Sequence, residues 1–355
     1  MPPIIRFIAS RLFSIFVTLF IVTAVLFGIV MLTPPDIRAT LYMPKTNRPL
    51  TDEQYQALVE KSIEKYHLRD PYPVQYVFWL SQWVRGNWGW SPILNDDVLK
   101  ALIRRTPVTA ELTLYSLLVF IPLGLVSGVV AAQHRGRSVD HYFRLSAFIA
   151  TSLPIFTLAV VLMAIFYVML PWFPPERLST PLYLFVKSTS FHQYTGLLTV
   201  DGILNGRLDI SLDAFRHLIL PVFALSLAHW ATLGRIMRSS MIEELQEDYI
   251  TAAKARGIPM HILYWQHAFR NALSPALASS ALSAASLFTG VSVIEIIFNI
   301  KGVSEMFLQS FLGIPDAAPA LSFAIYSVIV VLIVMLGLDV IQAIIDPRIR
   351  ESSIS

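Results

Sequence analysis

The sequence predicts an all-α membrane protein with six membrane-spanning helices and a small helical domain outside the membrane between the first two spans. Three observations lead to this class. The 355 residues are 55% hydrophobic and only 14% charged, whereas soluble domains carry about 25% charged residues. The mean hydropathy is +0.60. Six segments also have the composition of a span, which needs roughly 20 mostly apolar residues to cross the bilayer.

The six segments contain no charged residue. They are Leu12–Pro35, Leu112–Gln133, Leu145–Pro175, Leu218–Gly234, Ala272–Ile294 and Ala317–Leu338. The third is long enough to tilt or to end before Pro171, and the fourth is short and holds His229, which we interpret as a hydrogen-bonding group of the bundle rather than a metal ligand. Pro122, Pro154 and Pro221 lie inside spans and can bend them.

The first span is expected to stay in the protein. Arg6 and Arg11 precede it, as basic residues precede a signal peptide, but the apolar run is too long for an h-region and no A-x-A-like site follows. The chain then divides into 1–35 (N-terminus and first span), 36–111 (extracytoplasmic domain), 112–133 (second span), 134–144 (cytoplasmic loop), 145–170 (third span), 171–216 (extracytoplasmic insertion), 217–238 (fourth span), 239–271 (cytoplasmic segment), 272–295 (fifth span), 296–316 (extracytoplasmic loop), 317–342 (sixth span) and 343–355 (tail).

The short loops set the orientation. Six spans place both termini on one side, and basic residues gather in the loops of that side, which favours the cytoplasm. These residues are Arg6, Arg11, Arg135, Arg137, Arg144, Arg235, Arg238, Lys254, Arg256, Arg270, Arg348 and Arg350. Arg104 and Arg105, before the second span, point weakly the other way. Both termini are therefore expected in the cytoplasm.

The extracytoplasmic domain has its own helix signals. Thr51 and Gln54 form a capping-box pattern before a helix that Asp70-Pro71 is expected to stop, and a second amphipathic run covers Val74–Val84. An aromatic cluster ends with Trp88 and Trp90. Such a cluster either stacks on sugar or aromatic rings of a cargo or anchors the chain at the membrane interface, and we favour the anchor. The insertion 171–216 carries no recognisable motif and is a candidate to pack on this domain.

Residues 247–275 interrupt the apolar sequence with mixed charge. Helix formers run from Met241 to Ala255, Gly257 stands where a chain leaves a helix in a left-handed conformation, and Pro259 suits the first turn of a second helix. That short helix leads into the fifth span. Its composition fits either the membrane interface or a groove on a cytoplasmic partner, and the residues alone do not choose between them.

At these residues the chain resembles the membrane subunit of an ATP-binding-cassette importer, in the dipeptide/oligopeptide/nickel permease family. The run Thr251–Pro259 is similar to the family's alanine-rich helix and glycine corner, and His267–Pro275 is similar to the end of that motif. Thr251 replaces the glutamate of other importers, as is common in peptide permeases, and Ser274 replaces the usual leucine. The glycine corner itself is intact.

The resemblance covers most of the chain. Further matching segments are Ile4–Leu12, Lys65–Pro71, Gly86–Gly89, Val293–Glu295 and Ile345–Arg348. The longer 171–216 region and the run Asn299–Gly302 depart from the family pattern, which leaves the cargo open but not the transport class.

The resemblance implies a type I importer fold and a role as half of the pathway for peptides that an extracytoplasmic binding protein delivers. The region 239–271 then couples to two separate ATPase subunits. The coupling residues it implies are Ala253, Arg256, Gly257, Ile258, Pro259, His261, Ile262, Trp265 and His267. A second permease subunit, expected to be a distinct homologue, completes the pathway. The implied location is a prokaryotic plasma membrane, which is the inner membrane in a Gram-negative cell.

The chain is not expected to be an enzyme or to hold a cofactor or a metal. It has no Walker motif, so ATP and Mg²⁺ would belong to the partner ATPases. It has no cysteine, no H-E-x-x-H and no G-x-S-x-G, which argues against a membrane enzyme. The net charge of +3 gives no sign of a nucleic-acid partner. Alternatives are the same importer carrying oligosaccharides, or a secondary transporter, although no inverted repeat is evident.

Two carboxylates lie near span ends. Glu295 ends the fifth span on the outer side, and Asp339 lies at the inner end of the sixth. Ionisable groups in spans are candidates for a pathway. At these depths both can also reach water, and we favour that reading, so Glu295, Trp88 and Trp90 are kept as pathway or outer-end candidates.

Overall fold

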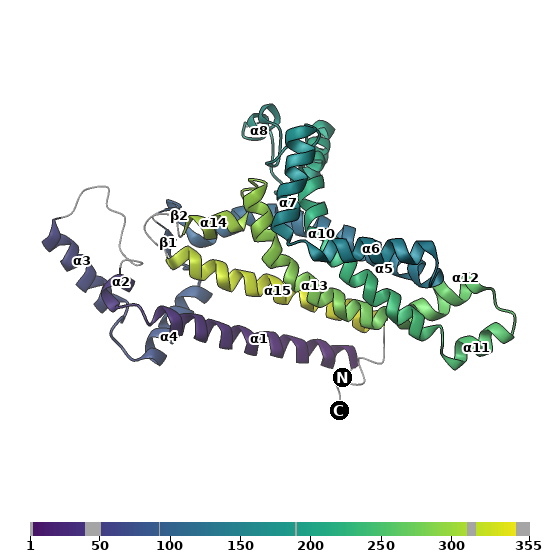
Figure 1. Ribbon diagram of the computed structural model, residues 1–355. Helices are drawn as coiled ribbons and strands as arrows, with labels where there is room; N and C mark the ends of the chain where they lie inside the picture. Colours follow the sequence, from purple (N-terminus) through teal and green to yellow (C-terminus); the bar gives the residue numbers. More distant parts are fainter. Residues whose placement is uncertain (1–2, 40–50, 92, 189, 311–316, 346–355) are drawn as a thin grey trace. The chain divides into compact units, whose positions relative to one another are not determined.

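The computed structural model describes residues 3–39, 51–91, 93–188, 190–310 and 317–345. Parts of the predicted extracytoplasmic domain, of the 296–316 loop and of the tail lie outside these residues. The chain forms two compact units, which we describe separately (Figure 1). The first comprises Met1–Ala9, Pro107–Lys301 and Val331–Ser355, and the second comprises Ser10–Thr106 and Gly302–Val330.

Five helices among the described residues are long and apolar enough to cross a membrane. They are Ile5–Val30, Val98–Gln133, Leu208–Glu244, Met260–Ile297 and Ala318–Ile341. The first lies in α1 (Pro3–Val30), and the next two are α5 and α10. The fourth joins α12 to α13, and the fifth lies in α15 (Ala317–Ile345). A bent pair of helices raises the number of candidate spans to six if the pair crosses as one.

The third predicted span, 145–170, is not one continuous helix. Helix α6 (Ser138–Ser152) ends before Pro154, and α7 (Ile155–Met163) continues into the π-helical segment η2 (Ala164–Met169). The two halves meet at 98° (Figure 1). Pro154 has no N–H group for an α-helical bond and disfavours the helical conformation of the residue before it. Leu153 is accordingly extended, with φ −97° and ψ 128°.

The core of the first unit is built by α5, α10 and α13 (Phe269–Ile297). Phe120, Leu233 and Leu287 are completely shielded from solvent there. Helices α5 and α10 approach closely at two glycines: a Cβ built on Gly128 would lie 2.6 Å from the carbonyl oxygen of Gly234. Any larger residue at 128 would therefore push the two helices apart.

The insertion 171–216 packs on α5, within the first unit. It contains α8 (Thr180–Val186), α9 (Leu198–Leu204) and the beginning of α10, around a small core of its own. Glu111 of α5, 1% exposed, accepts hydrogen bonds from the backbone N and the hydroxyl of Thr199 at 2.9 and 2.7 Å. Its other oxygen accepts one from Arg177 at 2.5 Å. This buried ion pair fixes the insertion to the bundle.

The second unit confirms the helix signals predicted within residues 36–111. Thr51 and Gln54 form the reciprocal capping box at the start of α3 (Asp52–Lys65). The helix ends earlier than expected, because His67 takes a left-handed conformation (φ 56°) before Asp70-Pro71 is reached. The second amphipathic run is α4 (Tyr72–Val84).

Four short elements, two strands and two helices, accompany the longer helices of this unit. The strands β1 (Trp90–Ser91) and β2 (Asp96–Asp97) pair antiparallel, a small exception to the all-helical expectation. Helices α2 (Pro35–Ala39) and α14 (Val303–Gln309) complete the described part. Arg38 of α2 is 6% exposed and donates to Gln75 Oε1 at 2.6 Å and to the carbonyl of Leu68 at 2.9 Å, which joins α2 to α4.

Candidate functional site

The segment between α10 and α13 folds into the predicted corner, with one difference. The expected helix from Met241 to Ala255 is interrupted: α10 (Leu208–Glu244) ends, and α11 (Asp248–Ala255) begins after Glu247, which is extended (φ −68°, ψ 147°). The new start at α11 puts Asp248 in a first helical turn, where the helix dipole favours an acidic residue. The segment therefore enters the corner through two helices rather than one.

Gly257 makes the corner in the way the sequence predicts. Its φ is +79°, a conformation that glycine adopts without strain. The N–H of Gly257 bonds to the carbonyl of Lys254 at 3.0 Å, and the N–H of Ile258 to that of Ala253 at 3.3 Å. These two bonds are the Schellman motif that closes a helix. A Cβ at Gly257 would meet nothing within 4 Å, so the backbone conformation alone requires glycine there.

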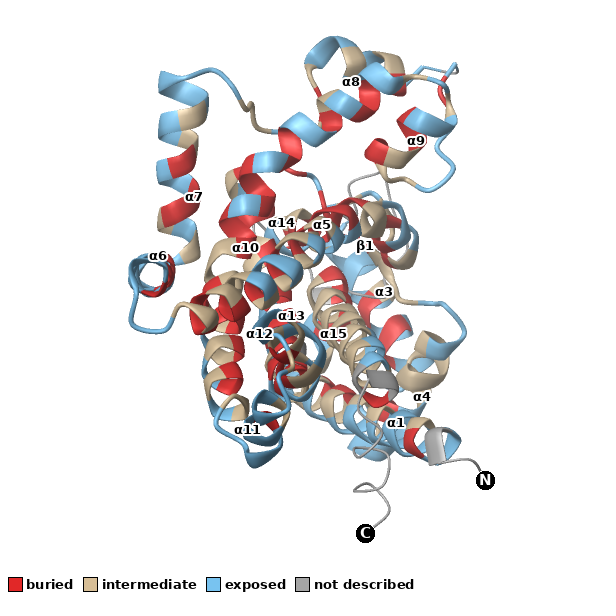
Figure 2. Ribbon diagram, turned by 90° about the vertical axis from the view of Figure 1, so that its right-hand side faces the viewer, coloured by how far each residue is buried: buried red, intermediate tan, exposed pale blue. Residues whose placement is uncertain are grey.

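The predicted coupling residues separate into two groups by burial. Arg256, Gly257, Pro259, His261 and Trp265 are exposed, whereas Ala253, Ile258, Ile262 and His267 are half-buried. In Figure 2, α11 is mostly pale blue, and the part of α10 beside it is mostly red or tan.

The half-buried group rests on the core of the first unit. Ala253 and Ile258 pack against the cluster that contains Ile250 and Leu263. Met260 and Trp265 remain 42% and 41% exposed beside that anchor. Buried side chains thus hold the corner, and its outward surface combines Met260 and Trp265 with the polar Arg256 and His261.

The short second helix after the corner is continuous with the helix of the fifth predicted span. Helix α12 (Met260–Ile262) passes through the π-helical segment η3 (Leu263–Ala268) into α13 without a break. Met260–Ile297 is therefore one helix of 38 residues. At 1.5 Å per residue, it spans about 57 Å, from the corner to the far end of α13.

The far end of this helix holds Glu295. The carboxylate is 1% exposed, and Oε1 accepts a hydrogen bond of 2.5 Å from the hydroxyl of Thr109 on α5. The expectation that Glu295 reaches water is wrong in this structure, because α5 covers it. Asp339, the other candidate carboxylate, is half-buried.

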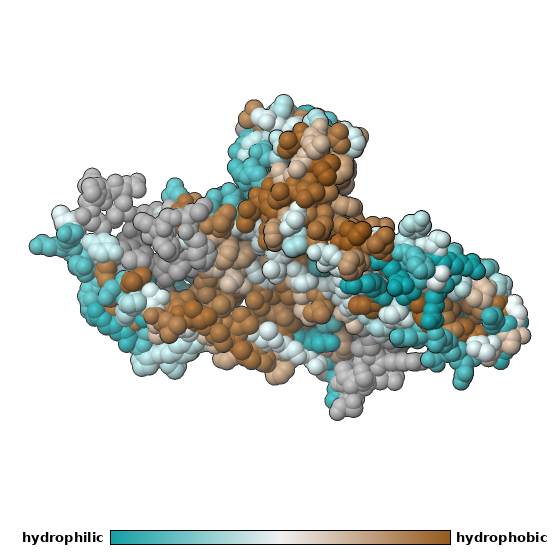
Figure 3. All heavy atoms as spheres, in the orientation of Figure 1, coloured by the Kyte–Doolittle hydropathy of each residue, from teal (hydrophilic) through white to brown (hydrophobic). Residues whose placement is uncertain are grey.

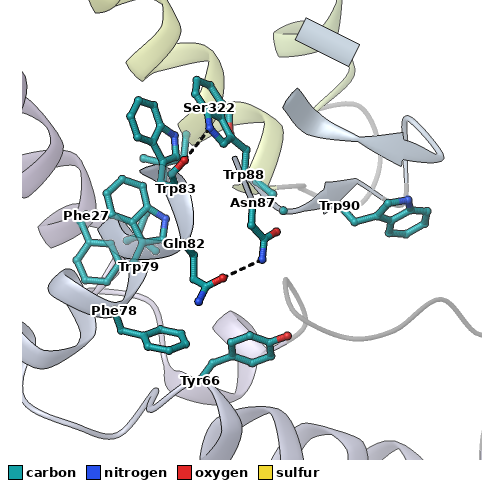
Figure 4. A pocket seen from close by; sticks show the side chains of 14 residues that line it. Phe27, Tyr66, Phe78, Trp79, Gln82, Trp83, Asn87, Trp88, Trp90 and Ser322 are labelled. Atoms are coloured by element: carbon teal, nitrogen blue, oxygen red, sulfur yellow. Dashed lines mark hydrogen bonds between the residues drawn. The ribbon is translucent and has the colours of Figure 1, made fainter. Parts of the chain in front are cut away.

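The aromatic cluster of the second unit encloses a cavity. Its volume is about 180 Å³, and Trp79, Trp83, Trp88 and Trp90 are among the residues that line it (Figure 4). Trp88 stacks on Trp83 with ring centroids 4.4 Å apart and donates its indole N–H to the Trp83 carbonyl at 3.1 Å. One face of the Trp88 ring is thus covered by Trp83, while Trp90 is half-buried at the cavity wall.

Comparison with known proteins identifies the family. The profile of the family described as "Binding-protein-dependent transport system inner membrane component" matches residues 121–351. The chain belongs to this family.

Curated relatives align over almost the whole chain. The di/tripeptide transport system permease protein DppB of Pseudomonas aeruginosa is 30% identical over 98% of this chain and 99% of its own length. The oligopeptide transport system permease protein AppB of Bacillus subtilis is 31% identical, over 93% and 94%. The oligopeptide transport system permease protein OppB of Salmonella typhimurium is 30% identical, over 98% and 99%.

Sequence reasoning missed one feature of this transport-system component, a polar triangle behind the corner. Tyr249 of α11 donates to Glu244 Oε2 of α10 at 2.6 Å and accepts from Asn271 of α13 at 2.9 Å. Burial and the bond to Glu244 raise the pKa of Tyr249 to about 12, so its hydroxyl stays a donor at neutral pH. Tyr249 precedes Asn271 by 22 residues, and no local pattern marks the pair.

Proposed function

We propose that this chain is a permease subunit of an ATP-driven importer and forms half of the translocation pathway for peptides. The relatives above are named for dipeptide, tripeptide and oligopeptide transport, which supports peptides over oligosaccharides as the cargo. An extracytoplasmic binding protein delivers the cargo. A second permease subunit, a distinct homologue, supplies the other half.

The observation that carries this proposal is the corner at Gly257. It is fixed by the Schellman bonds and the buried Leu263, and it exposes Met260 and Trp265. An apolar and aromatic helix end of this kind suits a groove on a partner protein. The coupling region 239–271 therefore docks on a separate ATPase subunit, two of which serve the importer.

The chain's own part is mechanical. ATP and Mg²⁺ are held by the ATPase subunits, because the sequence has no Walker motif. Movement of the docked corner displaces the helix Met260–Ile297 as one body, and its far end carries the contact between Glu295 and Thr109. This links the ATPase side of the chain to α5 at the other side.

The distribution of basic residues among the loops gives the proposed orientation in the membrane. Both termini, the 134–144 loop and the coupling region lie in the cytoplasm, and 36–111, 171–216 and 296–316 lie outside. The first span lies within 1–35, and the others are 112–133, 145–170, 217–238, 272–295 and 317–342 in their predicted bounds. They cross the plasma membrane of a prokaryote, which is the inner membrane in a Gram-negative cell. Glu295, Trp88 and Trp90 lie toward the extracytoplasmic end.

Co-expression with the cognate ATPase subunits tests the docking. Trp265→Ala combined with Met260→Ala removes two exposed contacts, and central aromatic contacts are worth about 2 kcal/mol or more each, so co-purification should fall at least tenfold. Tyr194→Ala is the control, since Tyr194 is 63% exposed in the insertion 171–216, on the proposed outer side. Equal recovery of the ATPase with all three proteins would exclude this docking surface.

A further inference from the structure

An open groove lies between α6 and α10, and its lining residues are outside the coupling region 239–271. Its volume is about 440 Å³, and it is lined by His141, Arg144, Leu145, Phe148 and Arg235. All five residues are exposed and belong to the first unit. The groove therefore combines three nitrogen-bearing side chains with two apolar ones.

The two arginines of the groove are not neutralised. Among the residues that the structure describes, neither Arg144 nor Arg235 forms an ion pair or side-chain hydrogen bond, whereas Arg238 one turn away is paired with Asp140. His141 bonds through Nδ1 to the carbonyl of Arg137 at 2.9 Å, so its Nε2 is not used in this bond. The groove thus presents two arginines without a salt-bridge partner among the described residues, because the carboxylate of Asp140, which lies near Arg144, is already paired with Arg238.

The groove also marks a change of polarity along α6. Arg144 and Phe148 are four residues apart, so they lie on the same side of the helix. The start of α6 exposes Ser138, His141 and Arg144 beside Val139 and Tyr142, whereas farther along the helix Leu145, Phe148 and Ile149 are 53–66% exposed. In Figure 3, hydrophilic residues gather over the end of α6 nearer α12, and hydrophobic ones cover α7.

We propose that this groove binds an anionic phospholipid, with Arg144 and Arg235 on the phosphodiester and Leu145 and Phe148 against the acyl chains. A basic pocket on the cytoplasmic side of a membrane helix bundle has the chemistry of such a headgroup site. Charge complementarity favours the lipid, because a phosphate satisfies both guanidinium groups and the attached chains cover the apolar side chains. The assignment to the inner leaflet rests on the proposed orientation, but the binding itself does not.

Native mass spectrometry of the full-length chain tests the proposal, with phosphatidylglycerol and phosphatidylcholine as the probes. The wild type should retain phosphatidylglycerol preferentially. Each basic residue near an anionic surface contributes about fivefold to affinity, so Arg144→Gln combined with Arg235→Gln should lower the preference roughly thirtyfold. Lysine at both positions should keep most of it, since the charge remains.

The matched control is Arg137→Gln, an exposed arginine of the same segment that does not line the groove. It should leave the preference unchanged. An equal loss with this control, or no loss with the double glutamine variant, would overturn the proposal. Complete displacement of phosphatidylglycerol by inorganic phosphate would also overturn it, because the groove would then bind a free anion. Shielding of the groove residues from solvent only when the ATPase is present would assign the groove to a protein contact instead.

Discussion

Arg238 of α10 holds the carboxylate of Asp140 of α6 with two hydrogen bonds, of 2.5 Å from Nε and 2.7 Å from Nη2. Asp140 is 1% exposed and also accepts the backbone N–H of Gly136 at 3.0 Å. The two residues are 98 positions apart in the chain. This pair fixes the loop before α6 to the end of the fourth predicted span.

Asp140→Asn should destabilise the protein. It leaves the half-buried guanidinium of Arg238 without its charge partner, and the loss of such a pair costs about 2 to 3 kcal/mol. Thermal unfolding in detergent measures the effect. Lys254→Gln, which removes an exposed charge of the neighbouring helix α11, should leave the midpoint unchanged, and equal shifts for the two variants would contradict the prediction.

Gly257→Val should abolish coupling while the chain still inserts into the membrane. The left-handed conformation costs a residue with a Cβ about 1 to 2 kcal/mol, and a β-branched residue more. Cargo-stimulated ATPase activity and uptake of the assembled importer are the measurements. Gly257→Asn is the control, because asparagine tolerates positive φ and the site has room for it. Normal uptake by the valine variant would show that the corner is not needed.

Glu111→Gln should loosen the insertion 171–216. The variant removes the charge that pairs with Arg177 at 2.5 Å, and a buried pair broken on one side costs about 3 kcal/mol. Limited trypsin digestion at Lys187, which is exposed, should become faster. Asp209→Asn breaks the exposed pair with Arg207 and should have little effect. Resistance to trypsin in the Glu111 variant would mean that the insertion is held by its apolar contacts alone.

Single cysteines should report the orientation, since the natural chain has none. Ser138→Cys lies at the start of α6, on the predicted cytoplasmic side, and Ser190→Cys lies in the insertion, on the predicted outer side; both residues are exposed. A membrane-impermeant maleimide added to intact cells (spheroplasts for a Gram-negative host) should label only position 190. Labelling of position 138 alone would reverse the topology.

Tyr249→Phe should weaken the junction of α10, α11 and α13 without a dependence on pH near neutrality. The raised pKa of Tyr249 means that the neutral phenol is the stabilised form. Its contribution is complete below the ordinary tyrosine pKa of about 10 and is lost as the pH rises through about 12. The difference in unfolding midpoint between the two proteins should therefore be constant from pH 7 to 9. A difference that disappears within that range would contradict the bond to Glu244.

Local signals in the sequence were enough for some elements and not for others. Thr51 with Gln54, and Gly257 with the helix before it, act within a few residues, so their structures could be predicted. The sequence predicts that Pro154 can bend a helix, but whether the helix bends or breaks there depends on the packing around it. The pairs Glu111–Arg177 and Asp140–Arg238 join residues 66 and 98 positions apart, and only the tertiary fold brings them together. The burial of Glu295 depends on α5 in the same way.

The π-helical segment at Leu263–Ala268 gives the long helix a place where its length can change. A π turn holds about one residue more than an α turn. Removing one residue there would restore regular α-helix and keep the relative orientation of Met260 and α13. The same deletion anywhere else in the helix would rotate one face against the other by about 100°. The segment is therefore the point at which insertions and deletions can be absorbed without misaligning the two ends of the helix.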